Sequence, residues 1–202
     1  MPFRYEAPVA PPPGKVIPPV KTTYQDVAAG LDQAIAANAD RTNSLYGKID
    51  TSRVAVAGHS CGGLQALQLG GDPRIKTVLV LNSGLFSDGA NPIAGMTVHK
   101  DLLKALHTPI LYMLGGPEDV AYPNGTDDFA RIDTVPAALV NLPTGHGGTF
   151  MQPNGGEGAK ITVAWLNWQL RGDKKAASMF VGEDCGLCRT SGVKIERKHL
   201  TM

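Results

Sequence analysis

The fold is decided by one stretch, RVAVAGHSCGG, which runs from Arg53 to Gly63. Its first half, Arg53–Ala57, is a short apolar run of the kind that forms a strand covered on both faces. Its second half contains Gly-x-Ser-x-Gly centred on Ser60, directly before a helical pattern at Leu64–Leu69. Glycine allows a sharp turn between strand and helix, which presents the serine hydroxyl above the sheet. The stretch therefore predicts a nucleophile elbow, whereas a chance Gly-x-Ser-x-Gly in a loop would lack the flanking strand and helix.

Working outward from this stretch, apolar runs alternate with helical patterns along most of the chain. Strands that alternate with helices predict an α/β fold with a mainly parallel sheet, flanked by helices and joined by right-handed crossovers. The predicted strands are Arg53–Ala57, Lys76–Asn82, Pro109–Leu114 and Ala137–Leu142. The predicted helices are Thr22–Ala39, Leu64–Leu69, Val98–Leu106, Asp127–Ile132 and Gly158–Leu170.

Length and composition limit the classes of protein that need to be considered. The 202 residues suffice for one main core, and 43% hydrophobic residues with a net charge of +1 are ordinary for a globular protein and imply no nucleic-acid partner. Nowhere is there an apolar run long enough for a membrane span, and the start is proline-rich, without the pattern of a signal peptide, so localisation stays open. We expect a proline-rich lead-in at residues 1–21, one domain at 22–172 and a polar tail at 173–202.

A serine nucleophile needs a base, and the base needs a carboxylate that orients it. In a fold with this elbow the chain order is serine, acid, histidine. Asp119 follows the third predicted strand, and His146 follows the fourth in a glycine-rich loop. Both positions lie at the carboxyl edge of the sheet, where open parallel sheets bind their ligands. We therefore predict that Asp119 and His146 complete a catalytic triad with Ser60.

Other residues are weaker candidates for these roles. Asp88 is the main rival acid because it follows the second predicted strand. The remaining alternatives are Glu118, which is adjacent to Asp119, Asp127 and Asp128, which resemble first-turn helix residues, and the histidines His59, His99, His107 and His199. Cys61 lies one residue beyond the position that the elbow exposes. We expect its main-chain N–H to bind an oxyanion and its thiol to be inert.

The end of the chain carries features to which we assign no role in catalysis. Cys185 and Cys188 could form a disulfide, half of a zinc site or a redox pair. A zinc site would need further ligands, and a redox pair belongs at a helix start after a strand, so we favour a disulfide or two free thiols. The basic run Lys194–His199 is interpreted as a solvated face. Trp165 and Trp168 are interpreted as packing residues.

These segments resemble the α/β-hydrolase superfamily, and within it the lipase-, dienelactone-hydrolase- and cutinase-like esterases, many of which are exported. The similar segments are Leu45–Asp50, Gly58–Gly63, Gly115–Gly125, Gly145–Thr149, Trp165–Asp173 and Cys185–Cys188. The resemblance implies that Ser60 is the nucleophile, Asp119 the acid and His146 the base, and that the N–H of Cys61 is one oxyanion donor. It implies hydrolysis of a small-molecule ester without a metal or organic cofactor.

The sequence departs from that superfamily before Ser60. Members normally place several strands there, together with a loop that gives a second oxyanion N–H. Here the preceding residues offer a proline-rich stretch and one predicted helix, so we expect the N-terminal half of the sheet to be missing. The elbow strand would then be an exposed edge that could pair with another copy of the chain. A catalytically silent domain that acts in binding or assembly is therefore the alternative function.

Overall fold

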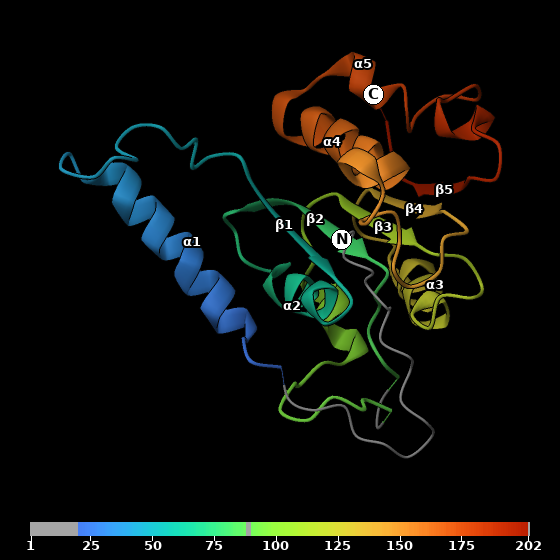
Figure 1. Ribbon diagram of the computed structural model, residues 1–202, viewed down its shortest axis with the longest axis horizontal. Coiled ribbons are helices and arrows are strands. Elements are labelled where there is room, and N and C mark those ends of the chain that lie inside the picture. Colours follow the sequence, from blue (N-terminus) through green and yellow to red (C-terminus); the bar gives the residue numbers. More distant parts are fainter. Residues whose placement is uncertain (1–19, 88–89, 202) are drawn as a thin grey trace, which may run out of the picture.

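The computed structural model describes residues 20–87 and 90–201. Nearly all of the predicted lead-in, and the rival acid Asp88, lie outside the described residues. Figure 1 shows a central sheet with helices on both of its faces.

The sheet has five strands, in the same order in space as in sequence. The first four strands are parallel, which confirms the predicted mainly parallel α/β fold, and the fifth pairs antiparallel with the fourth. The strands are β1 (Val54–His59), β2 (Ile75–Leu81), β3 (Ile110–Leu114), β4 (Ala137–Asn141) and β5 (Lys194–Lys198).

A helix lies at each of the five predicted places. The α-helices are α1 (Tyr24–Ala39), α2 (Cys61–Leu69), α3 (Tyr122–Arg131), α4 (Gly156–Arg171) and the short α5 (Lys174–Ala177). The segment expected as a helix at Val98–Leu106 is the 3₁₀ helix η1 (Lys100–Ala105); η2 (Pro153–Gly155) and η3 (Leu187–Arg189) are also 3₁₀ helices. Helix α3 begins five residues earlier than predicted, with Pro123 in its first turn, a position that proline tolerates. Helix α2 begins three residues earlier than predicted, and α5, η2 and η3 were not predicted.

Each central strand buries side chains on both faces of the sheet. Val80 and Tyr112 belong to the core beneath α2, η1 and α3, whereas their chain neighbours Leu79 and Leu111 belong to the core beneath α4. All four side chains are fully buried. Successive side chains of a strand point to opposite faces of the sheet. When both faces are covered, both sets of side chains are apolar, and the sequence does not alternate between apolar and polar residues. This double burial explains the continuous apolar runs in the sequence.

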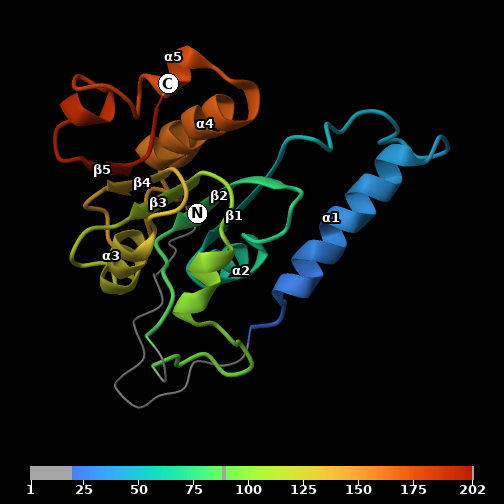
Figure 2. The same cartoon turned by 180° about the vertical axis from the view of Figure 1, so that it is seen from behind.

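The segment after Gly172, expected as a polar tail, instead completes the sheet and the second core. Strand β5 pairs with β4, and Phe180, Cys185 and Leu187 are almost fully buried. Cys185 and Cys188 form a disulfide. Figure 2 shows this segment beside α4, on the face opposite α3. The basic run gave no strand signal because β5 is an edge strand with mostly charged, solvated side chains.

Trp165 anchors this second core. It is fully buried, its Nε1–H donates to Thr77 Oγ1 over 2.8 Å, and its ring packs edge-on against those of Trp168 and Phe180. The predicted packing role of both tryptophans agrees with these contacts.

Strand β1 lies at the other edge of the sheet. Within residues 20–87 and 90–201, β2 is the only strand that pairs with it. Helix α1 packs against α2 at the side of the sheet, and every residue of α1 is at least partly exposed. In the part of the chain described here, each helix is too short or too polar to cross a membrane.

Candidate active site

Ser60 occupies the turn between β1 and α2 in a conformation that few residues adopt. Its φ is 53° and its ψ is −120°, a strained region that costs about 1 to 3 kcal/mol and concentrates at functional sites. The turn is tight: a Cβ atom on Gly58 would lie 2.0 Å from the carbonyl oxygen of Gly62. Glycine at position 58 is therefore needed for the strand and the helix to approach this closely.

Asp119 is buried in the turn after β3, with hydrogen-bond donors around both carboxylate oxygens. Oδ1 accepts from the N–H of Ala121 over 2.9 Å, and Oδ2 accepts from the N–H of Gly115 over 3.0 Å and from Asn82 Nδ2 over 2.9 Å. Burial by itself raises the pKa of Asp119, but these bonds and the bond from His146 together lower it to about 2. Asp119 is therefore a carboxylate at neutral pH.

His146 lies between Asp119 and Ser60 and connects them. Its Nδ1 is 2.7 Å from Asp119 Oδ1, and its Nε2 is 3.0 Å from Ser60 Oγ. Because a carboxylate only accepts hydrogen bonds, Nδ1 must carry the proton, and Nε2 is then free to accept from the serine hydroxyl. The three side chains form one continuous hydrogen-bonded chain in the order that a serine nucleophile requires.

The loops that carry the acid and the base are in direct contact. The N–H of Gly145 donates to the carbonyl of Gly115 over 2.8 Å, and a Cβ atom on Gly115 would lie 2.0 Å from the carbonyl oxygen of Gly145. Since β3 and β4 are adjacent and parallel, their C-terminal loops leave the sheet at the same edge. Glycine at position 115 lets the two loops approach without a clash.

Among the rival residues, His59 lies at the site, directly before Ser60, and Asp88 is outside the described residues. Glu118 is exposed. Asp127 and Asp128 are in the second half of α3, not in its first turn as expected, and both pair with Lys100. His99 precedes η1, His107 follows it, and His199 follows β5.

Sequence reasoning missed two residues that follow β2 at the same edge of the sheet. Asn82 has a positive φ of 45°, and its Nδ2 donates both to Asp119 and to the carbonyl of Gly145. Ser83 Oγ donates to the carbonyl of Ser60 over 2.7 Å. Their place directly after a buried parallel strand was the available signal, because such positions face the ligand edge.

The first turn of α2 offers a donor beside Ser60. The first N–H groups of an α-helix have no carbonyl partner within the helix, and they lie at the positive end of its dipole. Cys61 is the first residue of α2, so its N–H belongs to this group. Among the described residues no three His, Cys, Asp or Glu side chains cluster closely enough to hold a metal ion.

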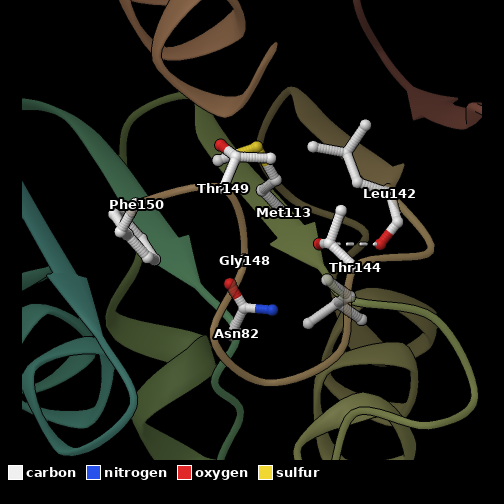
Figure 3. Close-up of a pocket in the computed structure, with 8 residues that line it drawn as sticks. Asn82, Met113, Leu142, Thr144, Gly148, Thr149 and Phe150 are labelled. Atoms are coloured by element: carbon white, nitrogen blue, oxygen red, sulfur yellow. Dashed lines mark hydrogen bonds between the residues drawn. The ribbon is translucent and has the colours of Figure 1, made fainter. Parts of the chain in front are cut away.

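A small cavity lies beside the loop after β4. Asn82, Met113, Leu142, Gly148 and Phe150 are among the residues that line this cavity, which has a volume of about 10 Å³ (Figure 3). Such a volume holds about one water molecule. The cavity is therefore too small for a substrate.

Apolar side chains lie exposed near the proposed nucleophile. Phe150 is 46% exposed and Met151 is 62% exposed. The Phe150 ring packs edge-on against the ring of His59, with 4.9 Å between the centroids, and His59 directly precedes Ser60. Phe150 thus offers an apolar side chain close to the hydrogen-bonded chain.

Comparison with known proteins places this chain in a family. The fold is similar to that of the uncomplexed acylaminoacyl peptidase of Pyrococcus horikoshii, with a TM-score of 0.55 and 16% sequence identity, over 73% of this chain and 28% of that chain. This chain therefore spans less than a third of the peptidase, and the likeness shows the α/β-hydrolase fold. None of the curated proteins matches the sequence. The model of the PETase family, described as PET hydrolase-like, matches residues 17–195, and the chain thus belongs to this family of the α/β-hydrolase superfamily.

Proposed function

We propose that this protein is a serine hydrolase that cleaves carboxylic esters with Ser60, His146 and Asp119 as its catalytic triad. The observation that carries the proposal is the chain of two hydrogen bonds, 3.0 Å from Ser60 Oγ to His146 Nε2 and 2.7 Å from His146 Nδ1 to Asp119 Oδ1. The positive φ of Ser60 and membership of a hydrolase family support it independently.

In this mechanism Ser60 Oγ forms a bond to the ester carbonyl carbon while His146 Nε2 takes the hydroxyl proton. The carbonyl oxygen becomes an oxyanion, to which the N–H of Cys61 donates. His146 then gives its proton to the departing alcohol, and an acyl-enzyme remains. Water attacks the acyl carbon with His146 again as the base, which releases the acid and restores Ser60. Asp119 stays ionised throughout and stabilises the imidazolium.

The surroundings of Ser60 favour small esters with an apolar group. The partly exposed side chain of Phe150, which packs on His59 directly before Ser60, offers an apolar contact surface. Burial of an apolar group contributes about 25 cal/mol for each Å² that is removed from water. We therefore expect short acyl esters to be hydrolysed, with butyrate preferred over acetate.

Hydrolysis of p-nitrophenyl acetate and butyrate tests the proposal. The purified protein is expected to turn over both esters, and Ser60→Ala is expected to lose about 10³-fold or more of kcat/KM. Ser87→Ala, a substitution at an exposed serine, is the matched control and should retain the rate of the unaltered protein. A Ser60→Ala variant as active as the control would exclude Ser60 as the nucleophile.

A catalytically silent domain that acts in binding or assembly is the second candidate. Within residues 20–87 and 90–201 the outer side of β1 pairs with no strand, which favours this candidate because an unpaired strand edge is a ready site for another strand. This candidate predicts that the folded protein hydrolyses no ester and that it associates with another copy through the outer side of β1. A monomer with ordinary esterase activity would contradict it.

A further inference from the structure

The loop that carries His146 is rich in glycine, so its main chain needs contacts from outside the loop to hold it. Gly145 and Gly148 have positive φ values of 69° and 57°, a region that glycine enters without strain. Asp119 holds the His146 ring at Nδ1, and Asn82 holds the carbonyl of Gly145. The Asn82 bond restrains the peptide unit on the N-terminal side of His146, but neither contact reaches the carbonyl on its C-terminal side, and a shift there would move Nε2 away from the serine hydroxyl.

His59 makes a contact that does reach the main chain of His146. Its Nε2 lies 2.7 Å from the carbonyl oxygen of His146. Because a carbonyl oxygen only accepts hydrogen bonds, Nε2 of His59 must carry a proton. Burial lowers the pKa of His59, which favours the neutral ring at pH 7. In that neutral ring the single N–H is the one that donates to His146.

The ring of His59 also packs against two residues of the same loop. Its centroid lies 5.1 Å from that of His146 and 4.9 Å from that of Phe150, with the Phe150 ring edge-on at 72°. His59 is the last residue of β1 and directly precedes Ser60. It therefore joins the strand of the proposed nucleophile to the loop of the proposed base by one hydrogen bond and two ring contacts.

We infer that His59 is a positioning residue that holds the main chain of His146 at a fixed distance from Ser60, an inference that rests on the proposed function. The bond would keep the loop in place while the His146 ring first accepts the proton of Ser60 and then donates it to the leaving alcohol. A displacement of about 1 Å between catalytic groups can lower the rate about 100-fold. Loss of the bond should therefore lower kcat and leave KM nearly unchanged.

Two substitutions at position 59 separate the hydrogen bond from the ring contacts. His59→Phe keeps an aromatic ring and removes the donor. His59→Gln removes the ring and keeps a donor, since the amide nitrogen of glutamine is as many bonds from Cα as Nε2 of histidine. His59→Phe is expected to lower kcat for p-nitrophenyl butyrate by about 10-fold to 100-fold with KM within about twofold, and His59→Gln to restore kcat to within about threefold.

Hydrogen–deuterium exchange of the peptide that spans residues 143–151 gives a readout that needs no activity. Exchange should be faster in His59→Phe than in the unaltered protein and should return towards the unaltered rate in His59→Gln. Equal exchange and equal kcat in His59→Phe and the unaltered protein would overturn the inference, as would a His59→Gln variant as impaired as His59→Phe. Should His59→Phe fail to fold, His59→Leu takes its place in the same comparison.

The two proposals fail in different ways. If the unaltered protein hydrolyses no ester, the proposed function is wrong, and the exchange rates of the variants still decide whether His59 holds the loop. If the unaltered protein is active and both exchange and kcat are unchanged in His59→Phe, the proposed function stands and the positioning role is wrong.

Discussion

Asp119 is the residue whose environment departs most from that of an ordinary surface aspartate. Hydrogen bonds lower its pKa from 3.8 to about 2 although burial opposes this shift. A carboxyl group with a depressed pKa in the folded state stabilises the fold above its unfolded pKa, and this contribution is lost as the pH falls from about 4 to about 2. The shift corresponds to roughly 2 kcal/mol.

We predict that Asp119→Asn lowers the free energy of unfolding at pH 7 by up to about 2 kcal/mol, and that the difference shrinks at pH 2.5. Urea unfolding at the two pH values measures it. The kcat of the same variant should fall about 10⁴-fold. An amide that donates to Nδ1 leaves the imidazole proton on Nε2, where it prevents His146 from accepting the proton of Ser60. An equal loss of stability at both pH values would show that the carboxylate charge is not the cause.

Asn82 has a positive φ, and its side-chain amide donates both to Asp119 and to the carbonyl of Gly145 in the loop of His146. Asn82→Gly removes the amide and keeps an unstrained backbone, whereas Asn82→Ala also adds strain in the left-handed region. We predict that both variants reduce kcat, and that Asn82→Ala is less stable than Asn82→Gly by about 1 kcal/mol. Thermal or urea unfolding measures this difference. Variants of equal stability would mean that the backbone relaxes at this position.

At the scale of elements, helix α3 is fixed to η1 through a buried ion pair. Asp128 is fully buried. Its carboxylate accepts hydrogen bonds from Lys100 Nζ over 2.6 Å, from the hydroxyl of Tyr112 over 3.2 Å and from the N–H of Leu85 over 2.7 Å. Burial raises the pKa of Asp128 to about 6 despite these contacts, which lower it. A raised carboxyl pKa means that the folded state favours the protonated form of Asp128 over the charged form. The contribution of Asp128 to the free energy of unfolding therefore falls as the pH rises from about 4 to about 6.

Lys100→Met should therefore destabilise the protein most above pH 6, where Asp128 of the unaltered protein is charged and gains from its pairing with Lys100. The expected cost at pH 7.5 is about 3 kcal/mol, and it should be smaller at pH 5, where Asp128 takes up a proton. Lys104→Met is the matched control, since Lys104 lies on the same 3₁₀ helix and forms an exposed pair with Asp101; its cost should stay below about 1 kcal/mol. Denaturant unfolding at both pH values tests this, and a pH-independent cost for Lys100→Met would contradict the account.

The sequence predicts elements well where one local signal dominates. The four parallel strands lie within two residues of their predicted ends because burial on both faces makes them apolar throughout. Strand β5 was missed because its pairing with β4 depends on a distant part of the chain and its side chains are mostly charged. The structure brings Ser60, Asp119 and His146 together as the motif order predicts. Asn82 and Ser83 were missed because their partners follow from strand adjacency and loop packing, which no short motif encodes.

For the molecule as a whole, the edge at β1 is the feature that bears on assembly. Within the described residues its outer side faces no other strand, and exposed edges pair readily with other chains. We predict that the protein associates as its concentration rises, and that Ala57→Lys, a charge at an exposed position of β1, shifts it towards monomer. Val163→Lys, at an exposed position of α4, is the control for an added charge. Light scattering after size exclusion reports the mass, and a protein that is monomeric at every concentration would contradict the prediction.

Covalent labelling tests the central claim, that Ser60 is a nucleophile activated by His146 and Asp119. A fluorophosphonate reacts with a serine only where a base and an oxyanion donor activate it. The account predicts stoichiometric addition to the folded protein, located on Ser60 by peptide mass mapping, with no addition to Ser60→Ala and much slower addition to His146→Ala. A folded protein that stays unlabelled, or that carries the label on another serine, would contradict the account.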